Sequence, residues 1–573
     1  MSQNHVRRLS TRLISSCSDR IQENRNAGST AVVEQVSWLQ YLKKNTHLRQ
    51  LRTWLKGQTK SLSIAALFAF CIAPTFISYR PYIYTYDDAG YLLQSIKVSQ
   101  ILWSESLHGL RYTISRDIHP PAMMLLGLPW GPLASWDAAG KCFITLAALI
   151  SLLAALCLYL LLRIGVKPFF LVLAAVCVGA SLGPYPHAGG IHYFATGFMA
   201  DSLFAWTALA SLLLIPYEAR TPCPLIRGAV LRGIIWGSIL SLGAMTKLSF
   251  LYFTGLIATF LFIVHFNRNG FRSTVAALIG FALSSAPAVL YLLLSGRTAL
   301  AHAMAGSFGT LADRVYYVPI LEYLNDTIRD SPGLLFSFTL TAAALIYLFI
   351  GRRPVKLWPD FVAASILIVF GIVVITSPHR EIRYEFPVIV ALPFLTAILL
   401  SGKRYSVPRP AAGLAAGLVF CGLLTGAMPM LHRADRESLA KSNAILAQAA
   451  QCNAKHIILA TGSPTLNGAL IGLALAVSSN HLIGVGGLPQ ADEPKILGVP
   501  LYSNDTLPAE KGFDRLLESD QVVFQNINGL IIDGSSELRT QRVAEYERYL
   551  RQSGYVPVRV DDDVNVYSIQ CRP

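Results

Sequence analysis

The segment Tyr84-Thr85-Tyr86-Asp87-Asp88-Ala89-Gly90-Tyr91 places two adjacent carboxylates just after the apolar run LSIAALFAFCIAPTFIS at positions 62–78. A carboxylate beside lipid is costly unless it is solvated, paired with a cation or used in chemistry. Asp87 and Asp88 also begin the segment DDAGYLLQSIKVSQILW, whose partial apolar face predicts a helix lying along the outer membrane surface. From these residues alone two interpretations stay open: the acids cap a solvated helix, or they belong to a reaction site.

The composition of the whole chain is that of an integral membrane protein. Its 573 residues are 53% hydrophobic and only 14% charged, whereas soluble domains carry about 25% charged residues. The net charge is +15, but the basic residues gather in short clusters between apolar runs. Such clusters orient membrane helices, so we expect a lipid bilayer as partner and no nucleic acid.

Eleven apolar stretches approach the length of about 20 residues that a membrane-spanning helix needs. They are residues 61–79, 142–162, 168–184, 200–216, 229–246, 248–265, 273–295, 333–350, 357–377, 385–400 and 410–430. Every second connection is basic, which predicts a cytoplasmic N-terminus and a C-terminus on the outer side. The sequence therefore predicts an α-helical polytopic membrane protein with about eleven transmembrane helices.

The charge and hydropathy pattern divides the chain into three parts. Residues 1–60 form a basic segment that we expect in the cytoplasm, and residues 61–431 form the transmembrane domain. Its first external loop, residues 80–141, is long and contains both acids. Residues 432–573 are polar and predict a small α/β domain outside the membrane.

Several local patterns support that C-terminal domain. The predicted strands are residues 456–461, 521–524, 529–534 and 564–569, and the predicted helix is residues 536–554. Cys452 and Cys571 bracket this region and can form a disulfide bond if the region lies outside the cytosol.

Two motifs in the first external loop carry a family resemblance. The first is Asp87-Asp88-Ala89-Gly90-Tyr91, and the second is DIHPPAMMLL at residues 117–126. In this order they resemble the corresponding loop of polytopic GT-C glycosyltransferases, in the bacterial branch of the protein O-mannosyltransferase superfamily that includes the lipid A aminoarabinose transferases. The resemblance covers the order of spans from about residue 61 to residue 430, and the external C-terminal domain fits it.

The resemblance implies a bacterial inner-membrane enzyme. It would move one hexose or pentose from a polyprenyl-phosphate donor to a glycan, lipid or protein of the cell envelope, with inversion at the sugar. Asp87 would be the general base for the acceptor hydroxyl, and Asp88 would orient the loop or the acceptor. No cofactor is expected, and a divalent metal ion stays an alternative; His187 and His192 show no ligand spacing that predicts a metal.

Eight further residues are candidates for substrate binding, and each has a structural alternative. They are Tyr91, Arg116, His119, Asp201, Lys247, Arg380, Arg383 and Tyr384. Asp201 either caps a helix or shapes the pocket, and Lys247 either reaches the interface or meets the donor phosphate. The two arginines of SPHREIRYEFP form either a salt-bridged turn or a phosphate contact. His119 stands where some relatives have lysine, and Gly90 where some have a basic residue.

A transporter or flippase of a lipid-linked glycan is the alternative function. Such proteins place charges mid-span and break helices at matching positions of two symmetric halves. This sequence instead gathers its charges at the predicted membrane faces, which favours chemistry at a surface. A third interpretation, a binding module anchored by the spans, leaves eleven spans without a use.

Overall fold

The computed structural model divides the chain into two units, Met1–Ser63 and Ile64–Pro573, and all described residues belong to the second unit. The described residues are 86–104, 120–131, 137–181, 200–221, 225–308, 320–321, 324–325, 338–339, 341–342, 358–376, 382–401, 441, 443–452, 454, 456–459, 495–498, 521–525, 547–561 and 564–569. The predicted N-terminal segment 1–60 lies outside them.

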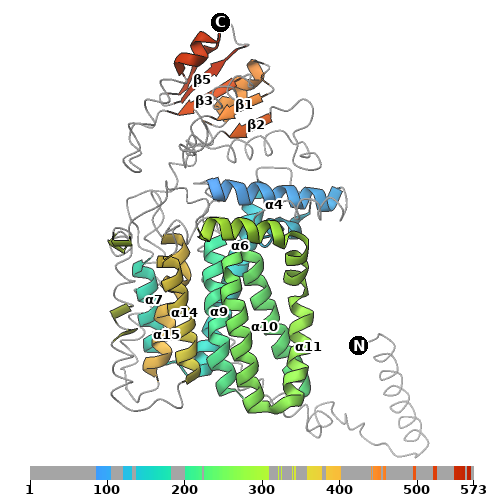
Figure 1. Cartoon of the computed structure of the whole chain (residues 1–573), viewed down its shortest axis with the longest axis vertical. Coiled ribbons are helices and arrows are strands. Elements are labelled where there is room, and N and C mark those ends of the chain that lie inside the picture. Colours follow the sequence, from blue (N-terminus) through green and yellow to red (C-terminus); the bar gives the residue numbers. More distant parts are fainter. Residues whose placement is uncertain are drawn as a thin grey trace, which may run out of the picture. The chain divides into compact units, whose positions relative to one another are not determined.

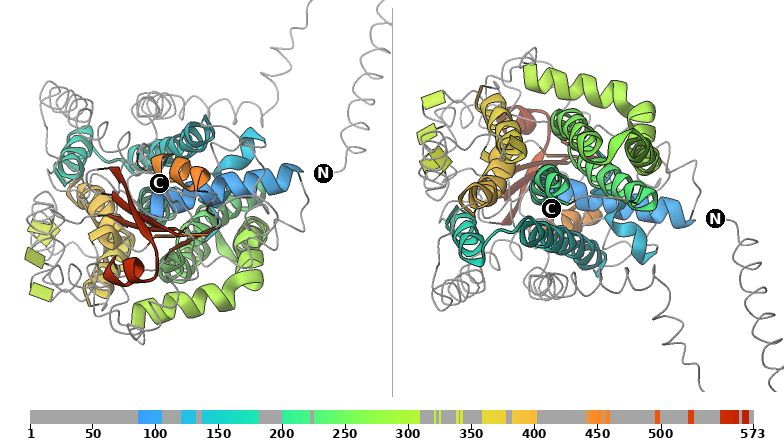
Figure 2. Two further views of the ribbon diagram at one scale, coloured as in Figure 1. Left: turned by 90° about the horizontal axis from the view of Figure 1, so that it is seen from above. Right: turned by 90° about the horizontal axis from the view of Figure 1, so that it is seen from below.

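Long apolar helices dominate the part of the chain before residue 402 (Figure 1). They are α4 (Tyr86–Ser104), α6 (Asp137–Ile164), α7 (Pro168–Ser181), α9 (Ala200–Arg220), α10 (Ile226–Thr246), α11 (Leu251–Phe308), α14 (Trp358–Thr376) and α15 (Phe386–Ser401). Three short 3₁₀ helices connect them: η1 (Met124–Trp130), η2 (Leu248–Phe250) and η4 (Ile382–Glu385). Helix α4 runs across the ends of the other helices in both the side and the end views (Figures 1 and 2).

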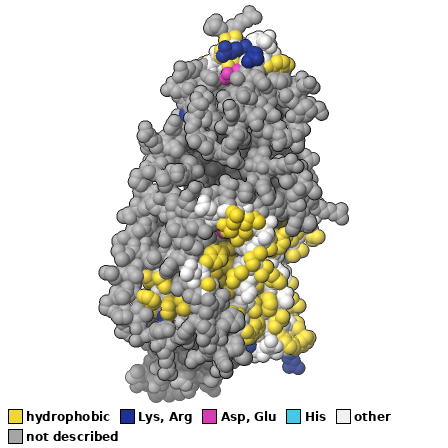
Figure 3. All heavy atoms as spheres, turned by 60° about the vertical axis from the view of Figure 1, so that its left-hand side comes forward, with side chains coloured by type: hydrophobic (Ala, Val, Ile, Leu, Met, Phe, Trp, Pro, Cys, Tyr) yellow, Lys and Arg dark blue, Asp and Glu magenta, His cyan; other side chains and the backbone are white. Residues whose placement is uncertain are grey.

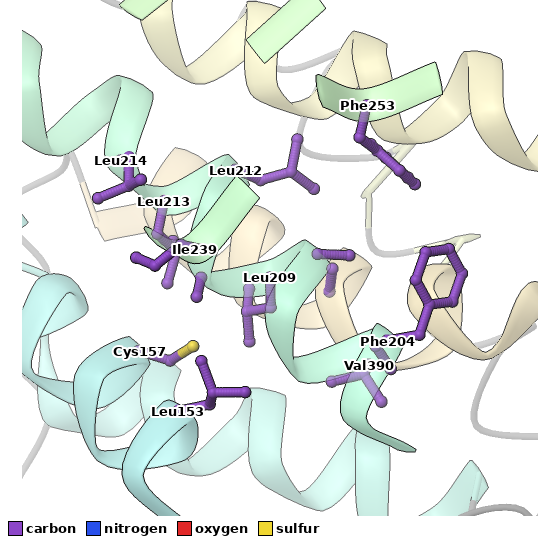
Figure 4. Packing of buried hydrophobic residues seen from close by; sticks show 14 of the residues in the cluster. Leu153, Cys157, Phe204, Leu209, Leu212, Leu213, Leu214, Ile239, Phe253 and Val390 are labelled. Atoms are coloured by element: carbon purple, nitrogen blue, oxygen red, sulfur yellow. The ribbon is translucent and has the colours of Figure 1, made fainter. Parts of the chain in front are cut away.

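Helix α9 lies at the centre of the core, because it contacts α6, α10, α11, α14 and α15. Its large side chains, such as Phe204, Leu209 and Leu213, are fully buried among residues of these neighbours (Figure 4). Its hydroxyl groups are satisfied inside the helix: Thr207 donates to the Leu203 carbonyl at 2.6 Å and Ser211 donates to the Ala208 carbonyl at 2.8 Å. A helix with no polar face can therefore be buried without unpaired side-chain donors.

Five of the described helical segments are long and apolar enough to cross a membrane: Lys141–Ile164, Ala200–Arg220, Ile226–Thr246, Leu248–Ser295 and Trp358–Thr376. The predicted spans 248–265 and 273–295 are both in α11, which is broken at Gly270 with φ 75° and ψ 177°. The predicted spans 168–184 and 385–400 correspond to the shorter helices α7 and α15. Spans 61–79 and 410–430 and most of 333–350 lie outside the described residues.

The outer surface of these helices is apolar. On α11, Leu283 is 69% exposed and Leu293 is 79% exposed, which would be unfavourable in water. On the face shown in Figure 3 the described side chains of the helical part are mostly hydrophobic. This surface is suited to contact with lipid tails.

Helix α10 packs against the second arm of α11 at backbone distance. A Cβ added at Gly233 would lie 1.9 Å from the carbonyl oxygen of Ala277. A Cβ at Gly280 would lie 2.2 Å from the Val230 carbonyl oxygen. Small residues permit such close approach, and they drive helix association in membranes through van der Waals packing.

We expect Gly233→Ala to destabilise the protein by about 1–3 kcal/mol or more, because the added methyl group meets main-chain atoms that cannot rotate away. Gly255→Ala is the matched control, since a Cβ there meets nothing within 4 Å. Unfolding of both variants in detergent, followed by a denaturant titration, measures the difference. Equal midpoints for the two variants would contradict the tight packing.

Five strands form one sheet in the C-terminal part of the chain, in the order β2-β1-β3-β5-β4. They are β1 (His456–Leu459), β2 (Lys495–Gly498), β3 (Gln521–Gln525), β4 (Val556–Asp561) and β5 (Val564–Ser568). Strand β1 is parallel to β2 and β3, and β5 is antiparallel to β3 and β4. Three predicted strands match β1, β3 and β5, whereas β2 and β4 were not predicted. The fourth predicted strand, 529–534, and most of the predicted helix 536–554 lie outside the described residues.

Candidate active site

An ion pair joins the beginning of α9 to the end of α10. Lys247 Nζ lies 2.5 Å from Asp201 Oδ1, and the two side chains are 18% and 4% exposed. The contact follows from the hairpin topology, because α10 runs back along α9 and ends beside its first turn. Lys247 leaves the helix in an extended conformation, φ −153° and ψ 130°, before η2 begins. We call this end of the helices the Lys247 end.

Two aromatic rings flank the same ammonium group. Lys247 Nζ lies 4.5 Å from the ring centroid of Tyr384, in η4, and 5.7 Å from that of Phe204, in α9. Cations are attracted to the faces of aromatic rings, most strongly where water is partly excluded. The structure therefore brings together three predicted site residues from distant parts of the sequence: Asp201, Lys247 and Tyr384.

The Pro-Pro motif lies directly beside Lys247. Ala122, which follows Pro120 and Pro121, donates its backbone N–H to the Met245 carbonyl at 2.8 Å. Both prolines are buried. The sequence predicted that these prolines start an apolar helix; the structure has instead the seven-residue 3₁₀ helix η1, which contains Pro129 near its end.

Helix α4, which carries the two acids, is fixed to η1 by side-chain hydrogen bonds. Gly127 N donates to Ser95 Oγ at 3.0 Å, and Ser99 Oγ donates to the Gly127 carbonyl at 3.3 Å. Trp103 Nε1 donates to the Leu128 carbonyl at 3.2 Å. Because η1 follows directly on the segment bonded to α10, hydrogen-bonded contacts connect α4 to the residue two before Lys247.

The other candidates differ in how far the structure places them. Asp87 and Asp88 lie in the first turn of α4, as predicted, and their side chains lie outside the described part. Tyr91 is partly buried and packs against the core. Arg383 belongs to η4, next to Tyr384, but its side chain is not described. Three candidates lie outside the described residues: Arg116, His119 and Arg380.

Two neighbours of the ion pair were not predicted as site residues. Phe204 is fully buried and lies against the Lys247 ammonium group, but an aromatic residue in an apolar helix gives no sequence signal for this role. Glu385 is 3% exposed and is adjacent to Tyr384. The sequence indicated only a local partner for nearby arginines at that position.

A second polar cluster lies at the opposite end of α9, which we call the Glu218 end. Arg232 Nη1 is 2.6 Å from both carboxylate oxygens of Glu218, and His265 Nδ1 donates to Glu218 Oε1 at 2.8 Å. His265 Nε2 lies 2.9 Å from Ser273 Oγ. The order carboxylate, imidazole, hydroxyl is that of a hydrolase triad, but Arg232 occupies the carboxylate and Glu218 and His265 are 0% exposed. This cluster is structural.

Another ion pair at this end links α9 to α14. Arg220 donates to both oxygens of Asp360, at 2.8 and 2.6 Å, in the bidentate geometry that suits a guanidinium. The sequence treated Arg220 and Arg232 as charges of basic loops, whereas the structure pairs both with buried carboxylates. Among the described residues, no group of three His, Cys, Asp or Glu side chains is arranged to hold a metal ion.

Comparison with known proteins adds a fold relationship. No protein-family model and no curated protein sequence matches the chain. One solved structure that does match is the crystal structure of ArnT from Cupriavidus metallidurans bound to undecaprenyl phosphate, with a TM-score of 0.53 and 12% sequence identity. The match covers 90% of this chain and 98% of that one. The chain is thus a mostly helical, multi-pass membrane protein of the GT-C fold, with a small sheet towards its C-terminus.

Proposed function

We propose that the protein is a glycosyltransferase of the bacterial inner membrane. It moves one monosaccharide from a polyprenyl-phosphate donor to a glycan, lipid or protein acceptor of the cell envelope, and it inverts the sugar. The transmembrane domain 61–431 carries the reaction, and the α/β domain 432–573 lies on the same outer side.

The observation that carries the proposal is the cluster at the Lys247 end. A partly buried ammonium group, its carboxylate partner and an aromatic face lie beside the Pro-Pro motif. Helix α4, with Asp87 and Asp88 in its first turn, is hydrogen-bonded to the same segment. The fold shared with ArnT, which is described as bound to undecaprenyl phosphate, supports a lipid phosphate as the group that Lys247 meets.

The reaction needs one base and a set of cations. The acceptor oxygen attacks the anomeric carbon while the bond from that carbon to the phosphate oxygen breaks, and Asp87 takes the acceptor proton. The lipid phosphate leaves with the bonding electron pair, and it needs no general acid because it is already a stable anion. Lys247 stabilises the charge that develops on it, with Arg380, Arg383 and Arg116 as further cations. Asp88, Tyr91, His119 and Tyr384 line the donor and acceptor positions.

The proposed orientation has independent support. Cys452 is disulfide-bonded, and disulfides persist in oxidising compartments outside the cytosol. Its predicted partner, Cys571, lies outside the described residues. The basic links between the spans, with the N-terminus inside, favour the same placement of the C-terminal part.

The test is sugar transfer by the purified protein with a panel of polyprenyl-phosphate sugars. We expect the wild type to release polyprenyl phosphate, and Lys247→Gln to lower the rate by about 10²–10³-fold because the departing phosphate loses a cation. Lys167→Gln is the matched control: Lys167 also lies just before a helix and is partly exposed, but it neighbours Ser401 at the far end of α15. Full activity of Lys247→Gln would contradict the proposed phosphate site.

The same assay separates the alternative function. A transporter or flippase would move the lipid-linked glycan between the leaflets of a liposome without forming a product. Flux without release of polyprenyl phosphate, for every donor of the panel, would reject the glycosyltransferase.

A further inference from the structure

We propose that Asp201 is a positioning residue that competes with the lipid phosphate for Lys247, and that it thereby promotes release of the product. The inference rests on the proposed function, since it takes Lys247 as the contact of the donor phosphate. It adds a role for the carboxylate that already occupies this cation.

The geometry leaves Lys247 with one close anion before any substrate binds. Asp201 Oδ1 takes one N–H of the ammonium group at 2.5 Å, and the Tyr384 ring lies 4.5 Å from the nitrogen. The Asp201 side chain is only 4% exposed, so little water screens its charge. A phosphate that reaches the remaining face of the ammonium group therefore meets a nearby negative charge as well as the positive one.

This repulsion acts unequally on the donor and the product. In the donor the phosphate is esterified on two sides, by the lipid and by the sugar, and carries one negative charge. After transfer it is a monoester, and such a group carries about −1.5 to −2 charges at pH 7. Asp201 thus weakens the binding of the product more than that of the donor, which favours turnover.

A purely structural role for Asp201 predicts the opposite sign. As a helix cap or as a partner of Lys247 alone, its loss would loosen the site and weaken the binding of any lipid phosphate. If the carboxylate competes with the phosphate, its neutralisation leaves the cation to the ligand alone. The binding then becomes tighter.

The experiment measures binding of undecaprenyl phosphate to the full-length protein, together with product inhibition during transfer. For Asp201→Asn we expect the Kd for undecaprenyl phosphate and the inhibition constant to fall about tenfold, with a smaller change in the KM for the donor. Asp201→Ser is a second neutral variant that keeps a small polar residue at the helix start. Asp360→Asn is the matched control, since it neutralises a similar ion pair at the Glu218 end, and its Kd should be unchanged.

The outcomes separate this inference from the proposed function. If Lys247→Gln weakens binding but Asp201→Asn and Asp201→Ser bind the product no more tightly than the wild type, the competition is refuted and the phosphate site stands. If Lys247→Gln binds as tightly as the wild type, the phosphate site itself is wrong, and the inference falls with it. Tighter binding by both Asp201 variants, with Asp360→Asn unchanged, establishes the competition.

Discussion

Asp87→Asn is expected to lower the transfer rate by about 10²–10⁴-fold, while the protein still binds its donor. Asparagine has nearly the same shape and still suits the first turn of a helix, so α4 should keep its place on η1. What is lost is the ability to take the acceptor proton as the acceptor oxygen attacks the anomeric carbon. The effect should therefore appear in kcat and only weakly in the KM for the donor.

Asp88→Asn tests the assignment of the base. Asp88 lies one residue further along the same turn of α4, so this variant makes the same chemical change at a neighbouring position. We expect a smaller loss, because Asp88 orients the loop or the acceptor and carries no proton. Transfer rates of the two variants, measured at saturating donor, decide between them: equal losses would mean that the acids act as a pair, and full activity of Asp87→Asn would place the base elsewhere.

Glu218→Ala is expected to destabilise the protein by about 3–5 kcal/mol, since it removes one partner of a buried charge pair. Arg232, only 15% exposed, would keep its charge without the carboxylate, and His265 Nδ1 would lose its acceptor. Three helices meet at this carboxylate, because Glu218 belongs to α9, Arg232 to α10 and His265 to α11. The midpoint of unfolding in a denaturant titration measures the loss.

A double variant shows whether the loss comes from the orphaned charge. Glu218→Leu combined with Arg232→Met replaces the pair by apolar side chains of similar volume, and such replacements are often neutral or stabilising. We expect the double variant to regain most of the lost stability. A double variant as unstable as Glu218→Ala would instead mean that the hydrogen bonds of the network, and not the unpaired charge, hold these helices together.

The membrane spans could be predicted because hydropathy is a local property of the chain. The break at Gly270 was predictable as well, since Arg268 and Arg272 interrupt the apolar run there. Strands β2 and β4 were not, because KILG is only four residues long and VPVRVD contains a proline. In the sheet, β4 is an edge strand, where a proline is tolerated.

The candidate site was predictable residue by residue but not as a cluster. Asp201 and Lys247 each stand at the end of an apolar run, which suggests a role for each of them but no contact between them. Their ion pair joins residues 46 positions apart and depends on how α9 and α10 pack. Arg232 shows the reverse case: its place in a basic link suggested only orientation, and tertiary packing draws it onto a buried carboxylate.

One link in the site end of the protein depends on no side chain. The N–H of Ala122 meets the carbonyl of Met245, and both are main-chain groups. Any residue except proline could stand at position 122 and still supply that donor. The distance between the Pro-Pro segment and the end of α10 is therefore protected against sequence drift, so that relatives can exchange nearly all their side chains and retain this frame, as a shared fold at 12% identity illustrates.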